Sequence, residues 1–194
     1  MNKPVASKPM PFVEPHEQDI ERAKLGDQNA MYRLYSSYSK AMLNSAHRIL
    51  NNRQDAEDVL QDSFVKIFSQ LHQFSYQSSF GSWIKRIVIN ASIDQLNRKR
   101  NDLSLYEDHE VADEEHNVIH IDQENGRQAQ LDLMYKALLE LPDGYRTVLS
   151  LYMLEGYDHE EISTILNIGV STSISQLSRA KKKLRAIIQK IQEP

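Results

Sequence analysis

Residues 158–184, DHEEISTILNIGVSTSISQLSRAKKKL, carry the pattern that decides the fold of the C-terminal part of this chain. Asp158 and Glu161 have the spacing of a capping box, in which two side chains bond the first turn of a helix. The tight turn Asn167-Ile-Gly169 then separates this short helix from a longer amphipathic one. Two helices joined by about three residues that include a glycine are typical of a helix-turn-helix, whose second helix enters the major groove of DNA.

The second helix of this motif is uncharged over its first half. No Lys or Arg lies between Val170 and Ser178, and the basic residues begin at Arg179. Paired hydrogen bonds from Arg to guanine are the commonest specific contact in the major groove. Basic side chains that contact only phosphates position a helix without reading the base sequence. The pattern therefore predicts phosphate anchoring with little base readout.

Ile174 lies in this uncharged half and has two interpretations. In the first, it belongs to the buried face of the helix, which then comprises Val170, Ile174, Leu177, Leu184 and Ile188. In the second, it faces DNA beside Lys181, and the buried face comprises Ser173, Leu177, Ala180, Leu184 and Ile187. Both fit the width of an apolar stripe on a surface helix. An exposed Ile174 could contact a thymine methyl group or a protein partner.

The composition excludes several classes of protein. The chain has 194 residues, a net charge of −4 and no cysteine, which rules out disulfides and thiolate metal sites. No signal peptide or membrane-spanning stretch is apparent, so the expected location is the cytoplasm. Because the whole chain is slightly acidic, any binding of nucleic acid must come from local basic patches.

The positions of proline and glycine predict an all-α protein. No proline lies between His16 and Leu141, and the glycines fall between the apolar-periodic runs. The expected divisions are a disordered tail at 1–16, a small helical domain at 17–100, a linker at 101–127 and a second small helical domain at 128–194. Nine acidic residues and no Lys or Arg lie between positions 101 and 125, which predicts that the linker is acidic and flexible.

Individual helices can be placed within the two domains. Acidic residues from Asp55 onward favour a helix start there, and the apolar spacing predicts a buried stripe of Phe64, Ile67, Phe68 and Leu71. Ser82 is the expected N-cap of the following helix. In the second domain, Pro142 is expected in the first turn of a helix that ends near Gly156.

Two basic segments flank the acidic linker. Residues 81–100 contain five basic residues and one acid, and residues 171–190 contain six basic residues and no acid. Two basic helices on one chain suggest two DNA contacts. For the cluster Arg98–Arg100 alone, a solvated helix face is an equal alternative.

Aromatic residues crowd the start of the first basic segment. Phe74 and Tyr76 are expected in a loop, where their rings could stack on an unpaired nucleotide. Phe80 and Trp83 are instead expected to be core residues that close a helix corner.

Three stretches together resemble one family, the extracytoplasmic-function sigma factors of bacterial RNA polymerase, which belong to the sigma-70 family. They are DAEDVLQDSFVKIF (55–68), SFGSWIKRIVINASIDQLNRKR (79–100) and ALLELPDGYRTVLSLYMLEGYDHEEISTIL (137–166). The resemblance implies sigma domain 2, a linker and sigma domain 4, in that order. It also implies a protein that binds core RNA polymerase and promoter DNA and directs transcription initiation, without catalytic residues, metal or cofactor.

The resemblance assigns roles to particular residues. Those implied to bind the clamp helices of the largest polymerase subunit are Asp55, Glu57, Asp58, Gln61 and Asp62. Those implied to bind and melt the promoter −10 element, with a flipped base held in a pocket, are Lys66, Gln70, Phe74, Trp83, Arg86, Ile87, Asn90, Arg98, Lys99 and Arg100. Those implied to face the −35 element are Ser171, Thr172, Ile174, Ser175, Gln176, Arg179, Lys181, Lys182 and Lys183. The acidic linker is implied to run toward the polymerase active site.

The chain departs from the family pattern in its recognition helix. Family members usually have Lys or Arg where this chain has Ile174, and often another basic residue at Gln176. We therefore hypothesise weak −35 specificity, with promoter choice resting on domain 2 or on a separate DNA-targeting partner. The resemblance further implies the polymerase flap as a contact of domain 4, and an anti-sigma factor as a regulator.

Two other classes of protein provide alternatives. A stand-alone helix-turn-helix regulator would bind palindromic DNA as a dimer and would not need polymerase. An enzyme is disfavoured, because the chain has no phosphate-binding glycine loop and His159-Glu-Glu161 is not the HExxH motif. His116 and His120 could hold a metal ion, but the sequence supplies no fixed third ligand.

Overall fold

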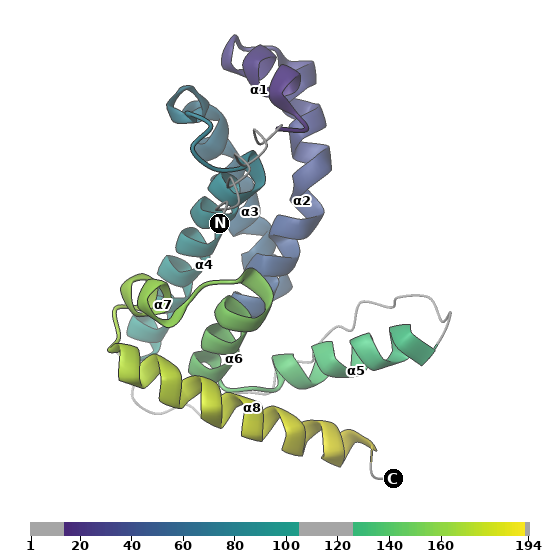
Figure 1. Cartoon of the computed structure of the whole chain (residues 1–194), viewed down its shortest axis with the longest axis vertical. Helices are drawn as coiled ribbons and strands as arrows, with labels where there is room; N and C mark the ends of the chain where they lie inside the picture. Colours follow the sequence, from purple (N-terminus) through teal and green to yellow (C-terminus); the bar gives the residue numbers. More distant parts are fainter. Residues whose placement is uncertain (1–13, 105–125, 193–194) are drawn as a thin grey trace, which may run out of the picture.

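The computed structural model describes residues 14–104 and 126–192, and every regular element within these ranges is helical (Figure 1). The N-terminal unit, residues 14–104, contains α1 (Glu17–Lys24), α2 (Gln28–Leu50), α3 (Arg53–Ser69), the 3₁₀ turn η1 (Leu71–Gln73) and α4 (Phe80–Ser104). The C-terminal unit, residues 126–192, contains α5 (Gly126–Leu139), α6 (Asp143–Ser150), the π-helical turn η2 (Leu151–Glu155), α7 (His159–Leu166) and α8 (Val170–Gln192). The prediction of an all-α protein with two helical domains is confirmed.

Side-chain caps set the ends of α2 and α3. The Asp27 carboxylate accepts hydrogen bonds from the backbone N–H groups of Asn29 (2.9 Å) and Ala30 (3.2 Å) at the start of α2. That helix stops at Asn51, whose φ of 52° is left-handed. Asn52 then accepts from the N–H of Asp55 and starts α3. Because the turn is so short, α2 and α3 pack side by side.

The core of the N-terminal unit forms where α2, α3 and α4 meet. The predicted stripe on α3 is confirmed, with Phe64, Ile67 and Leu71 at most 3% exposed and Phe68 packed against them. The expected N-cap at Ser82 is wrong. Here α4 begins at Phe80, so Ser82 lies inside the first turn; the Phe80 side chain is fully buried and the Ser79 hydroxyl accepts the N–H of Ser82 (3.1 Å).

The helix-turn-helix of the C-terminal unit is confirmed. The Asp158 carboxylate accepts the N–H of Glu161 (2.8 Å), and the Glu161 carboxylate accepts the N–H of Asp158 (2.9 Å). Asn167 ends α7 in the left-handed region, at a φ of 51°. The preceding helix follows Pro142, which is its N-cap, and continues through η2 to Gly156, whose φ is 84°.

Parts of the expected tail and linker lie outside the described residues, namely 1–13 and 105–125. At the margin of the tail, Glu14 is 5% exposed and accepts the N–H of Phe80 (2.9 Å). At the margins of the linker, α4 extends to Ser104 and α5 begins at Gly126. The two units pack against each other through α2 and α6 (Figure 1).

Candidate nucleic-acid interface

The exposed face of α4 carries polar and basic side chains, and its opposite face is fully buried. Ile84, Val88 and Ile89 are all 0% exposed. Arg86 and Asn90 lie one helical turn apart and are exposed, and Ile87 between them is half-buried. Asn can make paired hydrogen bonds with a base edge, and Arg can hold phosphate. The helical period thus brings three predicted −10 residues onto one surface.

Phe74 is a correction to the sequence prediction. It follows η1 as expected, but its side chain is only 4% exposed, and its ring packs 4.7 Å from Tyr76 and 5.4 Å from both Phe80 and Trp83, measured between centroids. A ring enclosed in this way has no free face for a base. The polar loop around Phe74 predicts exposure, but the chain folds back so that the rings at the start of α4 pack against it. Trp83 is half-buried and keeps part of its ring accessible.

The remaining −10 candidates lie at the edges of this surface. Lys66 is exposed on α3, and Gln70 is the half-buried C-cap of the same helix. Arg98, Lys99 and Arg100 are exposed near the end of α4. Two of these three have partners within the chain, since Arg98 donates to the carbonyl of Asp94 (3.4 Å) and Lys99 pairs with Asp55.

The residues of α3 that the resemblance assigns to polymerase binding divide into two groups. Asp55 pairs with Lys99 of α4, and Glu57 pairs with Arg53 (2.8 Å). Asp58, Gln61 and Asp62 form the second group, which we call the acidic face of α3, and all three are exposed. A basic partner would meet the acidic face first, because the first group is already neutralised by ion pairs.

The orientation of α8 resolves the two interpretations of Ile174. Ser173, Leu177 and Ala180 are buried at 0%, 6% and 0% exposure, whereas Ile174 is 52% exposed. Ser173 is suited to the core because its hydroxyl bonds the imidazole of His159 (2.9 Å). The buried face of the second interpretation is therefore confirmed, and Ile174 lies on the outer side of the helix.

The outer side of α8 changes from uncharged to basic along its length. Ser171, Thr172 and Ile174 are exposed, and Ser175 and Gln176 are half-buried. Arg179, Lys182 and Lys183 are exposed, and the Lys181 ammonium lies 5.6 Å from the centroid of the Tyr152 ring. This arrangement matches a helix that contacts phosphates more than base edges.

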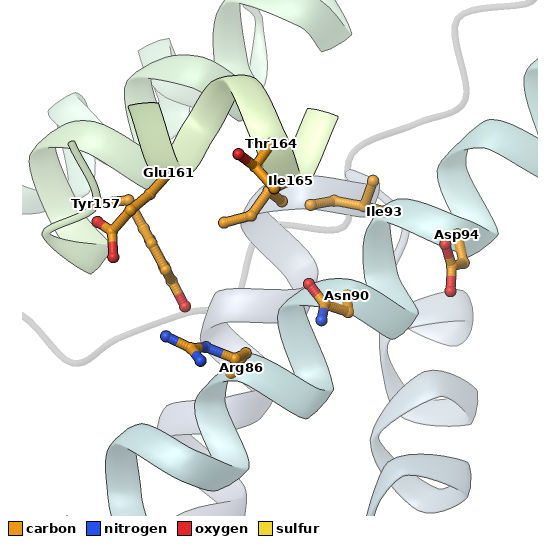
Figure 2. Close-up of a pocket in the computed structure, with 8 residues that line it drawn as sticks. All are labelled: Arg86, Asn90, Ile93, Asp94, Tyr157, Glu161, Thr164 and Ile165. Atoms are coloured by element: carbon orange, nitrogen blue, oxygen red, sulfur yellow. The ribbon is translucent and has the colours of Figure 1, made fainter. Parts of the chain in front are cut away.

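A cleft separates α4 from α7. It is lined from α4 by Arg86, Asn90, Ile93 and Asp94, and from the C-terminal unit by Tyr157, Glu161, Thr164 and Ile165 (Figure 2). The Tyr157 hydroxyl points toward the guanidinium of Arg86. Burial raises the pKa of Tyr157 above its usual value, against an opposing effect of Arg86, so the phenol stays neutral.

Two charged residues that sequence reasoning missed join the units below this cleft. Arg146 of α6 is 1% exposed and donates to the backbone carbonyls of Arg48 (3.0 Å) and Ile49 (3.2 Å). These carbonyls belong to the last turn of α2, where helix carbonyls lack partners in their own helix. The same guanidinium also donates to the carbonyl of Leu141 (2.8 Å) and pairs with Asp143 (2.6 Å).

Glu155 of η2 makes the second connection. Its side chain is 2% exposed, and its carboxylate pairs with Arg48 (2.5 Å) and Lys85 (3.0 Å) and accepts from the Ser45 hydroxyl (2.8 Å). Burial acts to raise the pKa of Glu155, but the hydrogen bonds from Arg48, Ser45 and Lys85 outweigh it and leave the pKa below the usual value of 4.5. The carboxylate is therefore ionised in the folded chain.

The described residues contain neither a cluster of metal-ligating side chains nor a membrane-spanning helix. Residues 14–104 and 126–192 contain no group of three or more side chains arranged to hold a metal ion. No helix in the same ranges is long and apolar enough to cross a bilayer. His116 and His120, the pair considered for metal binding, lie outside the described residues.

Comparison with known proteins identifies both units. The family model for Sigma-70 region 2 matches residues 34–101, and that for Sigma-70 region 4 matches residues 131–184. The chain is 31% identical over 175 residues to the ECF RNA polymerase sigma factor SigW of Bacillus subtilis, covering 86% of this chain and 92% of that one. It is 28% identical over 183 residues to the RNA polymerase sigma-H factor of Pseudomonas aeruginosa, covering 91% and 95%.

Solved structures show the same fold. The sigma factor RpoE of Bartonella quintana, crystallised with the anti-sigma factor NepR, superposes with a TM-score of 0.59 at 21% identity, over 81% of this chain and 96% of that one. CnrH, solved with the cytosolic domain of CnrY, gives 0.52 at 24% identity, over 90% and 97%. A match to region 2 as well as region 4 sets aside the stand-alone regulator, which would need only the helix-turn-helix. Sigma factors act in transcription initiation and are not enzymes. The chain belongs to the extracytoplasmic-function family of sigma-70 factors, which direct RNA polymerase to begin transcription at promoters.

Proposed function

We propose that the N-terminal unit provides both polymerase binding and −10 melting. The acidic face of α3, residues Asp58, Gln61 and Asp62, is exposed and suits the basic clamp helices of core polymerase. Asp55 and Glu57 contribute less in this proposal, because each already has a basic partner. The proposal also divides the chain into a tail (1–16), sigma domain 2 (17–100), a linker (101–127) and sigma domain 4 (128–194).

The observation that carries the −10 assignment is that Asn90 and Arg86 lie one turn apart on the exposed face of α4. A base flipped from the duplex exposes its hydrogen-bonding edge, which Asn90 can read, while Arg86 and Lys66 hold the neighbouring phosphates. Trp83, with part of its ring accessible, replaces Phe74 as the stacking residue. Melting of this kind captures an open strand, and no covalent bond breaks.

In the C-terminal unit, α8 acts as a phosphate anchor with weak −35 readout. Its support is the exposed Ile174 at the centre of the uncharged half, with Arg179, Lys182 and Lys183 exposed beyond it. Without a bidentate Arg, discrimination at one base falls by about 1–3 kcal/mol. Promoter choice then rests on α4, or on a DNA-targeting partner that raises the local concentration of promoter.

Two protein partners complete the proposal. Core polymerase would contact the acidic face of α3 and, through the flap, the C-terminal unit. An anti-sigma factor is a candidate regulator, because the similar fold of Bartonella RpoE was crystallised with one.

A single substitution tests the −10 site. We expect Asn90→Ala to abolish the permanganate-reactive bubble at a promoter while core polymerase still co-elutes with the variant. Asn44→Ala is the matched control, since it removes an exposed Asn from α2, outside the proposed site. A normal bubble with Asn90→Ala would show that the −10 pocket lies elsewhere.

A further inference from the structure

The loop between η1 and α4, residues 74–79, is held at both ends by the segment that precedes α2. Lys24 of α1 donates from its ammonium to the backbone carbonyl of Phe74 (3.1 Å), where the loop starts. Where the loop ends, the Glu14 carboxylate accepts the N–H of Phe80 (2.9 Å), the first residue of α4. The shape of the loop therefore depends on side chains from another part of the chain.

Tyr76, in the middle of this loop, has a backbone conformation that tyrosine rarely adopts. Its φ is 60°, in the left-handed region that favours glycine. Its hydroxyl donates to the Glu21 carboxylate (2.6 Å), and the Lys24 ammonium lies 4.8 Å from the centroid of its ring. Glu21 also pairs with Lys24 (2.8 Å). A strained backbone persists only where surrounding contacts fix it, and here these contacts come from α1. We call Glu21, Lys24 and Tyr76 the α1–loop cluster.

The protonation states of the α1–loop cluster suit these hydrogen bonds at neutral pH. The hydrogen bonds from Lys24 and Tyr76 hold the pKa of Glu21 below its usual value of 4.5, so the carboxylate is ionised and accepts from both. Burial, together with the nearby Glu21 carboxylate, raises the pKa of Tyr76, so the phenol keeps its proton and donates it. The cluster is therefore a lasting support for the loop.

The supported loop in turn contacts the ring that the proposed function assigns to base stacking. The Phe74 ring lies 4.7 Å from the Tyr76 ring and 5.4 Å from the Trp83 ring, measured between centroids. A flipped base stacks well only on a ring whose position is fixed, and neighbouring side chains provide that fixation. An unbroken series of contacts thus runs from α1 through Tyr76 and Phe74 to Trp83.

We propose that Glu21 and Lys24 of α1 are positioning residues for −10 melting. They act through the rings of Tyr76 and Phe74, which hold Trp83 where a flipped base stacks on it. The proposal rests on the proposed function of α4. Because the Glu21 side chain is 54% exposed and surface ion pairs contribute little to global stability, loss of the cluster should impair melting and leave the fold intact.

The first test uses fluorescence of the free protein, which reports on Trp83 alone because the chain contains one tryptophan. Lys24→Met removes the ammonium, and Lys40→Met, at an exposed position of α2, is the matched control. We expect Lys24→Met to increase quenching of the Trp83 emission by acrylamide, with urea unfolding unchanged, and Lys40→Met to change neither. Unchanged quenching in Lys24→Met would show that α1 does not hold the ring, and would overturn the proposal.

The second test measures melting by the holoenzyme reconstituted with each variant. Permanganate reactivity and initiation are compared on a duplex promoter and on the same promoter with a mismatched, already open −10 region. We expect Lys24→Met to lower the open fraction of the duplex about tenfold, the effect of losing one stacked base, and to initiate normally from the open template. Lys24→Arg keeps a donor and should restore melting. Equal losses on both templates would indicate a merely structural role and would overturn the proposal.

A second pair of variants keeps the proposal testable if Lys24→Met fails to fold. Tyr76→Phe removes only the hydroxyl that donates to Glu21, and Tyr32→Phe removes a hydroxyl from an exposed residue of α2 as its control. We expect Tyr76→Phe to reduce melting of the duplex and to spare the open template, and Tyr32→Phe to behave as wild type. Normal melting by Tyr76→Phe would count against the proposal.

Asn90→Ala separates failure of the positioning role from failure of the −10 site. If Asn90→Ala abolishes the bubble while Lys24→Met and Tyr76→Phe leave it unchanged, the positioning role is overturned and the −10 site stands. If Asn90→Ala leaves the bubble intact, the −10 site is wrong and the positioning role falls with it. Loss of the bubble in Asn90→Ala and in Lys24→Met, with both active on the open template, supports the two together.

Discussion

The two basic helices α4 and α8 expose different chemistry. The outer face of α4 combines an amide, Asn90, with the guanidinium of Arg86. At its first two turns α8 instead exposes hydroxyl groups and Ile174, and its basic residues follow only from Arg179 onward. Base edges are read by amides and guanidinium groups, and phosphates by any cation. In the proposed function, α4 therefore supplies specificity and α8 supplies affinity.

The difference depends on which face each helix buries. In α8, the small residues Ser173 and Ala180 are fully buried together with Leu177, and Ile174 remains on the outer side. In α4 the buried positions are branched, Ile84, Val88 and Ile89, and the polar residues remain outside. Burial in α8 thus leaves Ile174 on the outer surface of the helix, outside the core.

The largest expected effect is on the free energy of unfolding, and it distinguishes a core residue of α8 from a surface residue. Leu177→Ala should lower the free energy of unfolding by about 2–5 kcal/mol, because it leaves a cavity beside buried Ala180. Ile174→Ala should change it by only about 0.5 kcal/mol, because the side chain is half exposed. Urea unfolding of both variants measures the difference. Equal losses would place Ile174 in the core after all.

The next prediction has a smaller expected effect and concerns a substitution that makes α8 resemble a base-reading helix. Ile174→Arg adds a cation next to the uncharged half of the helix. Binding to duplex DNA should tighten, and the slope of log affinity against log salt should steepen by about 0.9, the value for one more phosphate contact. A salt titration with the duplex measures this. An unchanged slope would mean that position 174 does not reach DNA.

The smallest expected effect concerns pH. Burial acts against the ionised form of Glu155, but the partners Arg48, Ser45 and Lys85 lower its pKa below 4.5. A lowered carboxyl pKa stabilises the contact above pH 4.5, and this contribution is lost as the pH falls through the folded-state pKa. Energy transfer between dyes attached at Tyr32→Cys on α2 and Ile191→Cys on α8, both exposed positions, should therefore fall in acid. Asp19 and Asp27 also have lowered pKa values, so they can contribute to the pH dependence as well. The contribution of Glu155 is the difference between the pH profiles of energy transfer in the wild-type chain and in Glu155→Gln. The profile of the variant should be flatter.

Features set by neighbouring residues could be predicted from the sequence. The capping box of Asp158 and Glu161 and the buried stripe on α3 depend on residues within a few turns, and both are confirmed. The same holds for the uncharged half of α8. Its orientation could not be predicted, because two apolar faces overlap and the deciding hydrogen bond joins Ser173 to His159 of another helix.

Features set by distant residues could not be predicted. The carbonyls that Arg146 bonds lie 98 and 97 positions away, and Glu155 pairs with Arg48 across 107 positions. No local pattern marks such pairs. They join the two units, so the missed residues fix how the helices that carry the candidate sites are placed.

The most direct test of the central claim exchanges promoter elements in one experiment. Initiation by the reconstituted holoenzyme is measured on a promoter with its −10 element scrambled, with its −35 element scrambled, and unchanged. We predict that the −10 change abolishes initiation, since each mismatched base costs about 1–3 kcal/mol, and that the −35 change leaves most of it. A large loss from scrambling the −35 element alone would contradict the account, because it would show that α8 reads bases.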